Sequence, residues 1–130
     1  MHHLPYLRLL AVHAGLFTAC ALFGQARSGA HLTVDDIMGK PLVCDFGKVA
    51  YDVRIDTDST FYWKDKSGHE ETDKLMLVRI DDQSALLGWD ENDSTFVSMA
   101  INVSSGSAHV IYLTKGREMG SFSGAIRVKE

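Results

Sequence analysis

The chain has 130 residues, of which 45% are hydrophobic and 23% are charged, and its formal net charge is −4 with histidine neutral. This length predicts a single folded domain. The acidic balance and the lack of any Lys and Arg cluster in the sequence argue against nucleic acid as a partner, because binding to nucleic acid depends on neutralising phosphates.

The first 26 residues are typical of a secretory signal peptide. Arg8 precedes an apolar run over residues 9–23, and Gly24 and Ala26 supply the small residues that a cleavage site after Ala26 requires. The apolar run contains His13 and is shorter than the roughly 20 residues that span a bilayer. We therefore expect a periplasmic or secreted protein, with no transmembrane span in the mature chain.

An alternative processing route involves the first cysteine. The stretch ending Phe17-Thr18-Ala19-Cys20 resembles the lipobox of bacterial lipoproteins, in which the cysteine is lipidated and anchors the protein to a membrane. Under either route residues 27–130 form one domain in which Cys44 is the only cysteine. We expect no internal disulfide, and Cys44 is interpreted as a small buried apolar residue.

A short helical turn is predicted at the start of the domain. Thr33 is suited to cap the turn, Asp36 lies three residues later as in a capping box, and Gly39 is suited to end it. The segment is long enough for one turn only.

Eight strands are predicted after this turn. They are rich in Val, Ile, Phe, Tyr, Trp and Thr, and apolar and polar residues alternate along them, as in Val49, Tyr51, Val53 and Ile55. The predicted ranges are 41–46, 49–55, 59–63, 75–80, 84–89, 95–103, 107–114 and 121–128.

Short turns between these strands indicate antiparallel neighbours. Eight strands in simple order would leave two exposed edges, which closure removes. We therefore predict an all-β fold, an antiparallel up-and-down barrel of lipocalin type. A barrel of about eight strands has an interior that side chains fill or that holds one small ligand.

One connection is longer and entirely polar. Residues 64–74 contain no apolar side chain and are interpreted as a solvated loop at a barrel mouth. Carboxylate pairs such as Glu70 and Glu71 are expected to be exposed at turns, with ordinary pKa values. His69 and His109 lack the spacing of zinc ligands, so neither a metal site nor a cofactor is predicted.

The aromatic residues give the main functional indication. Small-molecule sites are concave and largely apolar or aromatic, with a few polar groups. Residues near the strand ends are predicted to line such a site, with one histidine as a polar contact: Tyr51, Trp63, Trp89, Met99 and His109. The expected function is binding of a small apolar or aromatic molecule, without catalysis, because no nucleophile elbow or phosphate loop occurs in the sequence.

The order of several short motifs resembles a known family. The motifs are Gly39-Lys40, Asp45-Phe46-Gly47, a strand ending at Trp63, Gly88-Trp89-Asp90-Glu91 with the strand after it, and a closing strand at 122–128. In this order they are similar to the MoaF-like (molybdenum-cofactor biosynthesis protein F-like) proteins. The resemblance implies a lipocalin-like barrel with a ligand pocket.

Two alternative functions remain open. The segment carrying Ser105, Gly106, Lys115 and Gly116 resembles the membrane-bound inhibitors of C-type lysozyme, which implies a periplasmic inhibitor of a lysozyme-type hydrolase. Those inhibitors usually have a second cysteine, which this domain lacks. A small barrel enzyme is the other alternative, and it would require a polar cluster inside the lumen.

Overall fold

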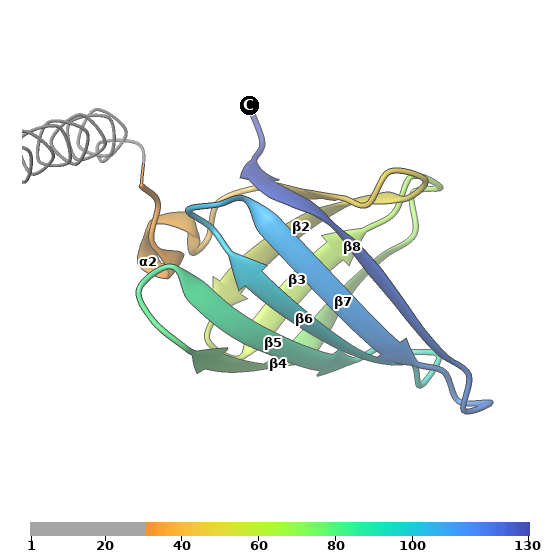
Figure 1. The fold of residues 1–130 in the computed structure, drawn as a ribbon. Coiled ribbons are helices and arrows are strands. Elements are labelled where there is room, and N and C mark those ends of the chain that lie inside the picture. Colours follow the sequence, from red (N-terminus) through yellow and green to blue (C-terminus); the bar gives the residue numbers. More distant parts are fainter. Residues whose placement is uncertain (1–30) are drawn as a thin grey trace, which may run out of the picture. The chain divides into compact units, whose positions relative to one another are not determined.

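The computed structural model describes residues 31–130, which contain a barrel of eight strands and one short helix (Figure 1). The predicted signal peptide, its cleavage site after Ala26 and the alternative lipidation at Cys20 lie outside the described residues. In chain order the elements are α2 (Val34–Ile37), β1 (Leu42–Asp45), β2 (Ala50–Thr57), β3 (Thr60–Lys64), β4 (Glu70–Arg79), β5 (Ser84–Asp90), β6 (Phe96–Asn102), β7 (Ser107–Leu113) and β8 (Met119–Val128).

The strands form a closed antiparallel barrel in sequence order. Each strand pairs with the next one in the chain, and β8 returns to pair with β1. At this closing seam Leu42 lies opposite Val128, and Asp45 lies opposite Ala125. The predicted all-β, up-and-down barrel is confirmed, and closure leaves no strand with an unpaired edge.

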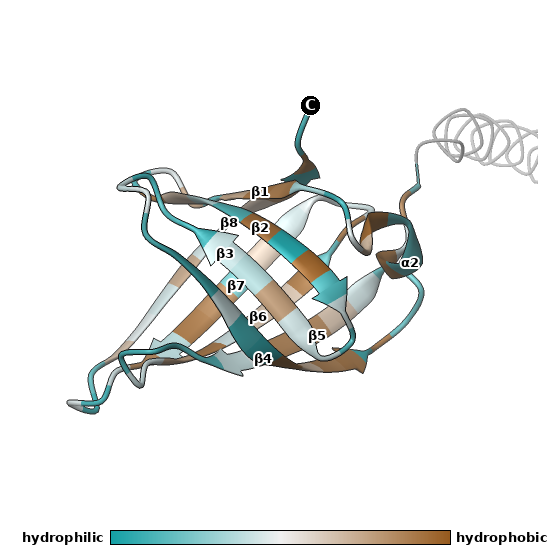
Figure 2. Ribbon diagram, turned by 180° about the vertical axis from the view of Figure 1, so that it is seen from behind, coloured by the Kyte–Doolittle hydropathy of each residue, from teal (hydrophilic) through white to brown (hydrophobic). Residues whose placement is uncertain are grey.

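The core is the inner face of the barrel. Because successive side chains of a strand point to opposite faces, every second residue is buried, as Val97, Met99 and Ile101 are on β6. Figure 2 shows this alternation as hydrophobic and hydrophilic bands along the strands. The alternation read from the sequence therefore identifies the face that each residue occupies.

Helix α2 covers one end of the barrel. Val34 and Ile37 are almost completely buried, and the Val34 N–H donates to the carbonyl oxygen of Asp82 at 2.7 Å. The predicted capping box is present: Thr33 Oγ1 accepts from the Asp36 N–H, and the Thr33 N–H donates to Asp36 Oδ2. These contacts explain why one helical turn is stable at this position.

The region from 64 to 74 differs from the prediction. It is not one long loop, because β3 continues to Lys64 and β4 begins at Glu70. The two strands pair across the region, with Trp63 opposite Glu71 and Phe61 opposite Asp73. Its polar residues alternate in and out like those of any other strand, and the carboxylates of Glu71 and Asp73 point inward.

Candidate functional site

A cavity of about 350 Å³ occupies part of the barrel lumen. Every strand except β4 contributes a side chain to its wall, and most of these side chains are apolar or aromatic. The lining residues are Cys44, Phe46, Tyr51, Val53, Phe61, Trp63, Asp65, Trp89, Glu91, Thr95, Val97, Met99, Val110, Tyr112, Thr114 and Phe122.

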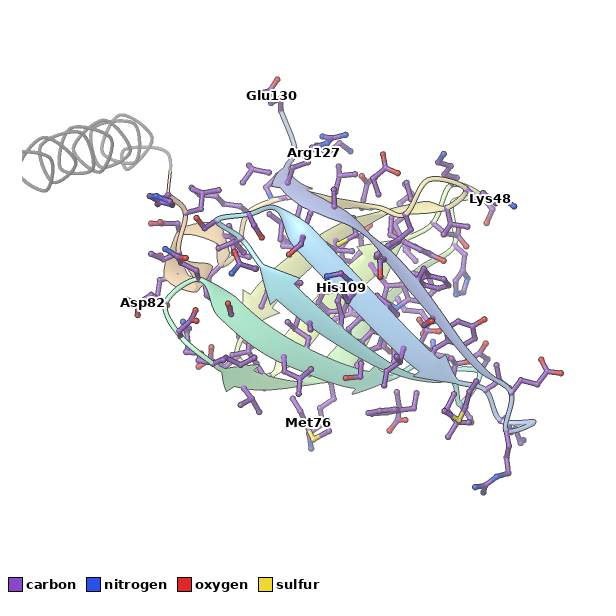
Figure 3. The ribbon with its side chains drawn as sticks, in the orientation of Figure 1. Lys48, Met76, Asp82, His109, Arg127 and Glu130 are labelled. Carbon is purple, nitrogen blue, oxygen red and sulfur yellow. The ribbon has the colours of Figure 1, made fainter. Side chains whose placement is uncertain are left out.

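The cavity extends to the loops at the end of the barrel away from α2. Asp65 follows β3, Glu91 follows β5 and Thr114 follows β7, and all three line the cavity. Figure 3 shows the two ends of the barrel: Asp82 lies beside α2, and Lys48 lies in the β1–β2 loop at the opposite end. We call that opposite end the loop end.

Aromatic rings contact one another in pairs in the cavity wall. The Tyr51 and Trp63 rings meet edge to face with centroids 6.1 Å apart, and the Phe61 and Trp89 rings are tilted with centroids 4.3 Å apart. A further ring contact joins Tyr112 to Phe122 at 5.3 Å. Because the rings hold one another in place, these walls are formed before any ligand arrives.

Four of the five predicted site residues lie together in this wall: Tyr51, Trp63, Trp89 and Met99. The fifth, His109, does not, and its prediction as a contact inside the lumen was wrong. Its neighbours Ala108 and Val110 are buried, so the period of two places His109 on the outer face of β7 (Figure 3). There its Nδ1 lies 2.8 Å from Ser123 Oγ on β8.

Asp73 is a buried carboxyl group that is paired with Trp63. The Trp63 Nε1–H donates to Asp73 Oδ2 at 2.9 Å. Burial raises the pKa of Asp73, the hydrogen bond from Trp63 opposes this, and nearby Glu71 raises the pKa further. The hydrogen bond fixes the indole of Trp63 in the cavity wall.

Glu71 connects two loops at the loop end. One carboxylate oxygen lies 2.7 Å from His69 Nε2, in the β3–β4 loop, and the other accepts from the Asn92 backbone N–H, in the β5–β6 loop, at 2.8 Å. The hydrogen bond with Glu71 raises the pKa of His69. The Glu71 side chain is 5% exposed, so these two bonds compensate for its removal from water.

Glu91 has no comparable partner. Among the described residues its side chain makes no ion pair, and burial, opposed by the neighbouring Trp89 indole N–H, raises its pKa to about 7. The adjacent Trp89 Nε1–H is buried and has no hydrogen-bond partner within residues 31–130. The indole is close enough to favour the ionised form of Glu91, but the two groups do not meet in hydrogen-bond geometry.

Asp65 is the second carboxyl group in the cavity lining, and unlike Glu91 it accepts several hydrogen bonds. Its Oδ1 accepts from the Ser67 hydroxyl and from the backbone N–H groups of Ser67 and His69. These bonds, of which that from the Ser67 side chain is the strongest, lower the pKa of Asp65. Asp65 is therefore a fixed negative charge at neutral pH.

The prediction that the carboxylate pairs are exposed and have ordinary pKa values is wrong at this end of the barrel. Glu71 and Asp73 are buried, and the pKa values of Asp73 and Glu91 are raised. A signal for the two buried carboxylates was present in the sequence, because Glu71, Asp73 and Leu75 continue the period of two of β4. The polar character of the segment concealed that pattern.

Other chemistry finds little support in the part of the chain that is described. Within residues 31–130, no three His, Cys, Asp or Glu side chains are arranged to hold a metal ion. No helix in this range is long and apolar enough to cross a membrane. Cys44 is a free, buried cysteine whose pKa is raised by burial to about 12.

Comparison with known proteins identifies the fold alone. No family model matches the sequence. No curated protein matches it either. Among solved structures, a protein from Burkholderia vietnamiensis named "putative beta-lactamase" is similar, with a TM-score of 0.66 and 12% identity over 72% of this chain and 95% of that chain. At this identity the similarity supports the barrel and carries no statement about activity.

Proposed function

We propose that this protein is an exported, non-enzymatic barrel that binds a small apolar or aromatic molecule in its lumen. The observation that carries the proposal is the cavity of about 350 Å³ lined by Tyr51, Trp63, Trp89 and Met99. Its size lies at the lower end of the range of small-molecule sites. The similarity to MoaF-like proteins, which implies a pocket of this kind, stays a prediction.

The site favours a compact, flat molecule. Ring faces and edges from several strands surround the cavity, and each Å² of apolar surface that a ligand removes from water is favourable by roughly 25 cal/mol before the entropic costs of binding are subtracted. The Thr95 and Thr114 side chains and the two carboxyl groups in the lining give a ligand polar contacts near the loop end. A ligand would therefore bind with its apolar body deep in the barrel and its polar group near the loops.

Filling the cavity tests the proposal. Val110 and Ile111 are consecutive residues of β7; Val110 lines the cavity, and the side chain of Ile111 is on the outer face. We expect Val110→Phe to abolish ligand binding, because the new ring fills the cavity, and Ile111→Phe to leave binding unchanged, because its ring points to solvent. Both variants introduce the same ring on the same strand, so they are a matched pair. Binding is measured by tryptophan fluorescence in titrations with fatty acids, flavins and phenolic compounds.

Two results would argue against the binding function. One is a set of titrations in which no compound changes the fluorescence of the unsubstituted protein. The other is equal binding by the two variants, which would place the ligand outside the lumen. Circular dichroism of both variants confirms that each is folded before the comparison is made.

Proton transfer is a second candidate function, favoured by a specific observation. A carboxyl group with a pKa of about 7 in an apolar cavity matches the requirement for a general acid or base at neutral pH, and Glu91 is such a group. We rank it second because no other group among the described residues is hydrogen-bonded to Glu91 as its catalytic partner. Deuterium exchange into a bound carbon acid, lost in Glu91→Gln, would be the evidence for it.

Inhibition of a lysozyme-type hydrolase has less support from the geometry. Ser105 and Gly106 precede β7, whereas Lys115 and Gly116 follow it, so the two turns lie at opposite ends of the barrel. A strand of this length separates them by roughly 20 Å. One compact contact face would not include both, and a lysozyme assay with Lys115→Ala as the control variant tests this alternative directly.

A further inference from the structure

The charges in the cavity wall are of one sign. Among the described residues that line the cavity, Asp65 and Glu91 are the charged ones, and no Lys, Arg or His is present. Glu71 and Asp73 are buried at the same end of the barrel and face inward. Two carboxyl groups therefore line the loop end of a largely apolar cavity, and two more are buried close to it.

Hydrogen bonds hold three of these carboxyl groups, but few cationic side chains face them. In residues 31–130 the ion pairs of Arg54, Arg79 and Lys129 are made with aspartates elsewhere on the barrel. Among the described residues, the one ion pair at this site joins Glu71 to the partly exposed His69. A cavity with low-dielectric walls and charges of one sign concentrates a negative potential, which attracts cations.

Glu91 is the carboxyl group that most clearly lacks a partner. It lines the cavity, its side chain makes no ion pair with the described residues, and the only polar side-chain group close enough to favour its ionised form is the Trp89 indole N–H. Burying a carboxylate without a partner is costly. A positively charged group at the cavity mouth would supply the missing interaction.

The walls below Glu91 are suited to the same ligand. Tyr51, Trp63 and Trp89 line the cavity, and the π-faces of tyrosine and tryptophan attract organic cations, especially where water is excluded. Carboxylates at the mouth and aromatic rings in the wall therefore favour one kind of molecule, an apolar body that carries a positive charge.

We infer that the ligand of the lumen is a small organic cation, an amine or quaternary ammonium compound on an aromatic or alicyclic body, whose charged group lies between Glu91 and Asp65. This inference rests on the proposed binding function and specifies the chemical class of the ligand. The apolar body would occupy the wall formed by Trp63, Trp89 and Met99.

The pH dependence follows from the groups around Glu91. The groups that face it are acidic or neutral near pH 7, apart from one histidine: Tyr51, Asp65, His69, Glu71, Asp73, Trp89 and Asp93. The ionised form of Glu91 attracts a cation, whereas the protonated form does not. Binding of a permanently charged cation is therefore expected to tighten as the pH rises through about 7.

Calorimetric titration with three probes of similar shape tests the inference. The probes are 2-phenylethylamine (a cation), 2-phenylethanol (neutral) and phenylacetate (an anion). We expect the amine to bind at least about tenfold more tightly than the alcohol, with no measurable binding of the anion. We also expect the affinity for the amine to rise between about pH 5.5 and about pH 8, where its ammonium group stays protonated.

Two variants separate the local charge from the total charge. Glu91→Gln removes the carboxylate at the cavity, and Asp90→Asn removes the same charge from the adjacent, outward-facing residue. We expect Glu91→Gln to weaken binding of the amine about tenfold and to reduce its pH dependence to the part that comes from His69, while binding of the alcohol is unchanged. Asp90→Asn should behave as the unsubstituted protein does.

The outcomes distinguish this inference from the proposed function. Equal affinity for amine and alcohol, or an equal effect of the two variants, would overturn the inference and leave the lumen as a site for neutral molecules. If no probe binds and Val110→Phe also changes nothing in the wider panel of ligands, the binding function fails and the inference fails with it.

Discussion

Two carboxyl groups at the same cavity have opposite environments. Three hydrogen bonds from a tight turn hold Asp65 in its ionised form, whereas Glu91 is half-buried and, among the described residues, has only the Trp89 indole N–H to favour its ionised form. The difference comes from the loops, because Ser67 follows Asp65 at the spacing of an Asx turn and the same loop brings the His69 N–H back to Asp65. One group is a permanent charge, and the other changes charge near neutral pH.

The raised pKa of Glu91 makes the stability of the protein depend on pH. Its pKa is about 7 in the folded protein and near 4.5 when the chain is unfolded, so the folded state binds the proton more tightly. Stability from this group is therefore present below about pH 4.5 and is lost as the pH rises to about 7. We expect Glu91→Gln to be more stable than the unsubstituted protein at about pH 8, by about 1 to 3 kcal/mol.

Urea unfolding at about pH 5 and about pH 8 measures this difference. Asp90→Asn is the control, since it changes the same charge on the outer face of β5. A stability gain at about pH 8 that is the same in both variants would show that the effect is one of net charge and that Glu91 is not its source.

Cys44 is expected to be unreactive in the folded protein. It is 1% exposed, and burial raises its pKa to about 12, so the thiolate that reacts with alkylating reagents is almost absent at neutral pH. Iodoacetamide should label the peptide containing Cys44 only after denaturant is added, as measured by mass spectrometry. Rapid labelling of the native protein would show that the inner face of β1 is open to solvent.

At the scale of elements, the barrel depends on a close contact where β8 meets β1. A Cβ atom built on Gly124 would lie 2.1 Å from the backbone oxygen of Asp45. Because backbone atoms cannot move aside as a flexible side chain does, β8 fits here only without a side chain. Gly124 is thus required by the closing seam of the barrel.

We expect Gly124→Ala to destabilise the fold by about 3 kcal/mol or more, because the seam between β1 and β8 must shift. Gly116→Ala is the matched control: the nearest atom to its Cβ is a side-chain oxygen at 3.9 Å, and its φ is not positive. Thermal unfolding of both variants measures the effect, and similar melting temperatures would contradict the importance of the seam.

The predicted elements were most accurate where alternation is between apolar and polar residues. For β6 this pattern identifies both the strand and the inward residues Val97, Met99 and Ile101. In the first half of β4 both the inward and the outward residues are polar, so the pattern there predicts a loop. Hydropathy cannot separate the inward Glu71 and Asp73 from the outward Thr72 and Lys74.

The site was predictable to a similar extent. The position of the aromatic residues near strand ends, together with the aromatic character of small-molecule sites, predicts their place in the cavity wall, and the structure places Tyr51, Trp63 and Trp89 there. His109 was misplaced, since it is out of phase with Ala108 and Val110. The hydrogen bond between Glu71 and Asn92 joins loops that are 21 residues apart in the sequence, and the surroundings of Glu91 depend on the same loops. A local sequence pattern does not predict such contacts.

At the scale of the whole molecule, processing of the chain remains a prediction. Full-length protein expressed in a bacterial host is expected to be exported and to begin at Arg27, which intact-mass measurement of the periplasmic fraction would detect. A mass that corresponds to a lipidated Cys20 would support the anchored alternative instead. Retention of all 130 residues in the cytoplasm would contradict both routes.

The barrel has two different ends, and this difference has a kinetic consequence. Helix α2 covers one end with Val34 and Ile37, and Glu71 fastens the β3–β4 loop to the β5–β6 loop at the other. If a ligand enters the lumen at the loop end, as proposed, it passes these joined loops, although Glu71 is not part of the cavity wall. Glu71 would then influence the residence time of the ligand, while the wall residues determine its affinity.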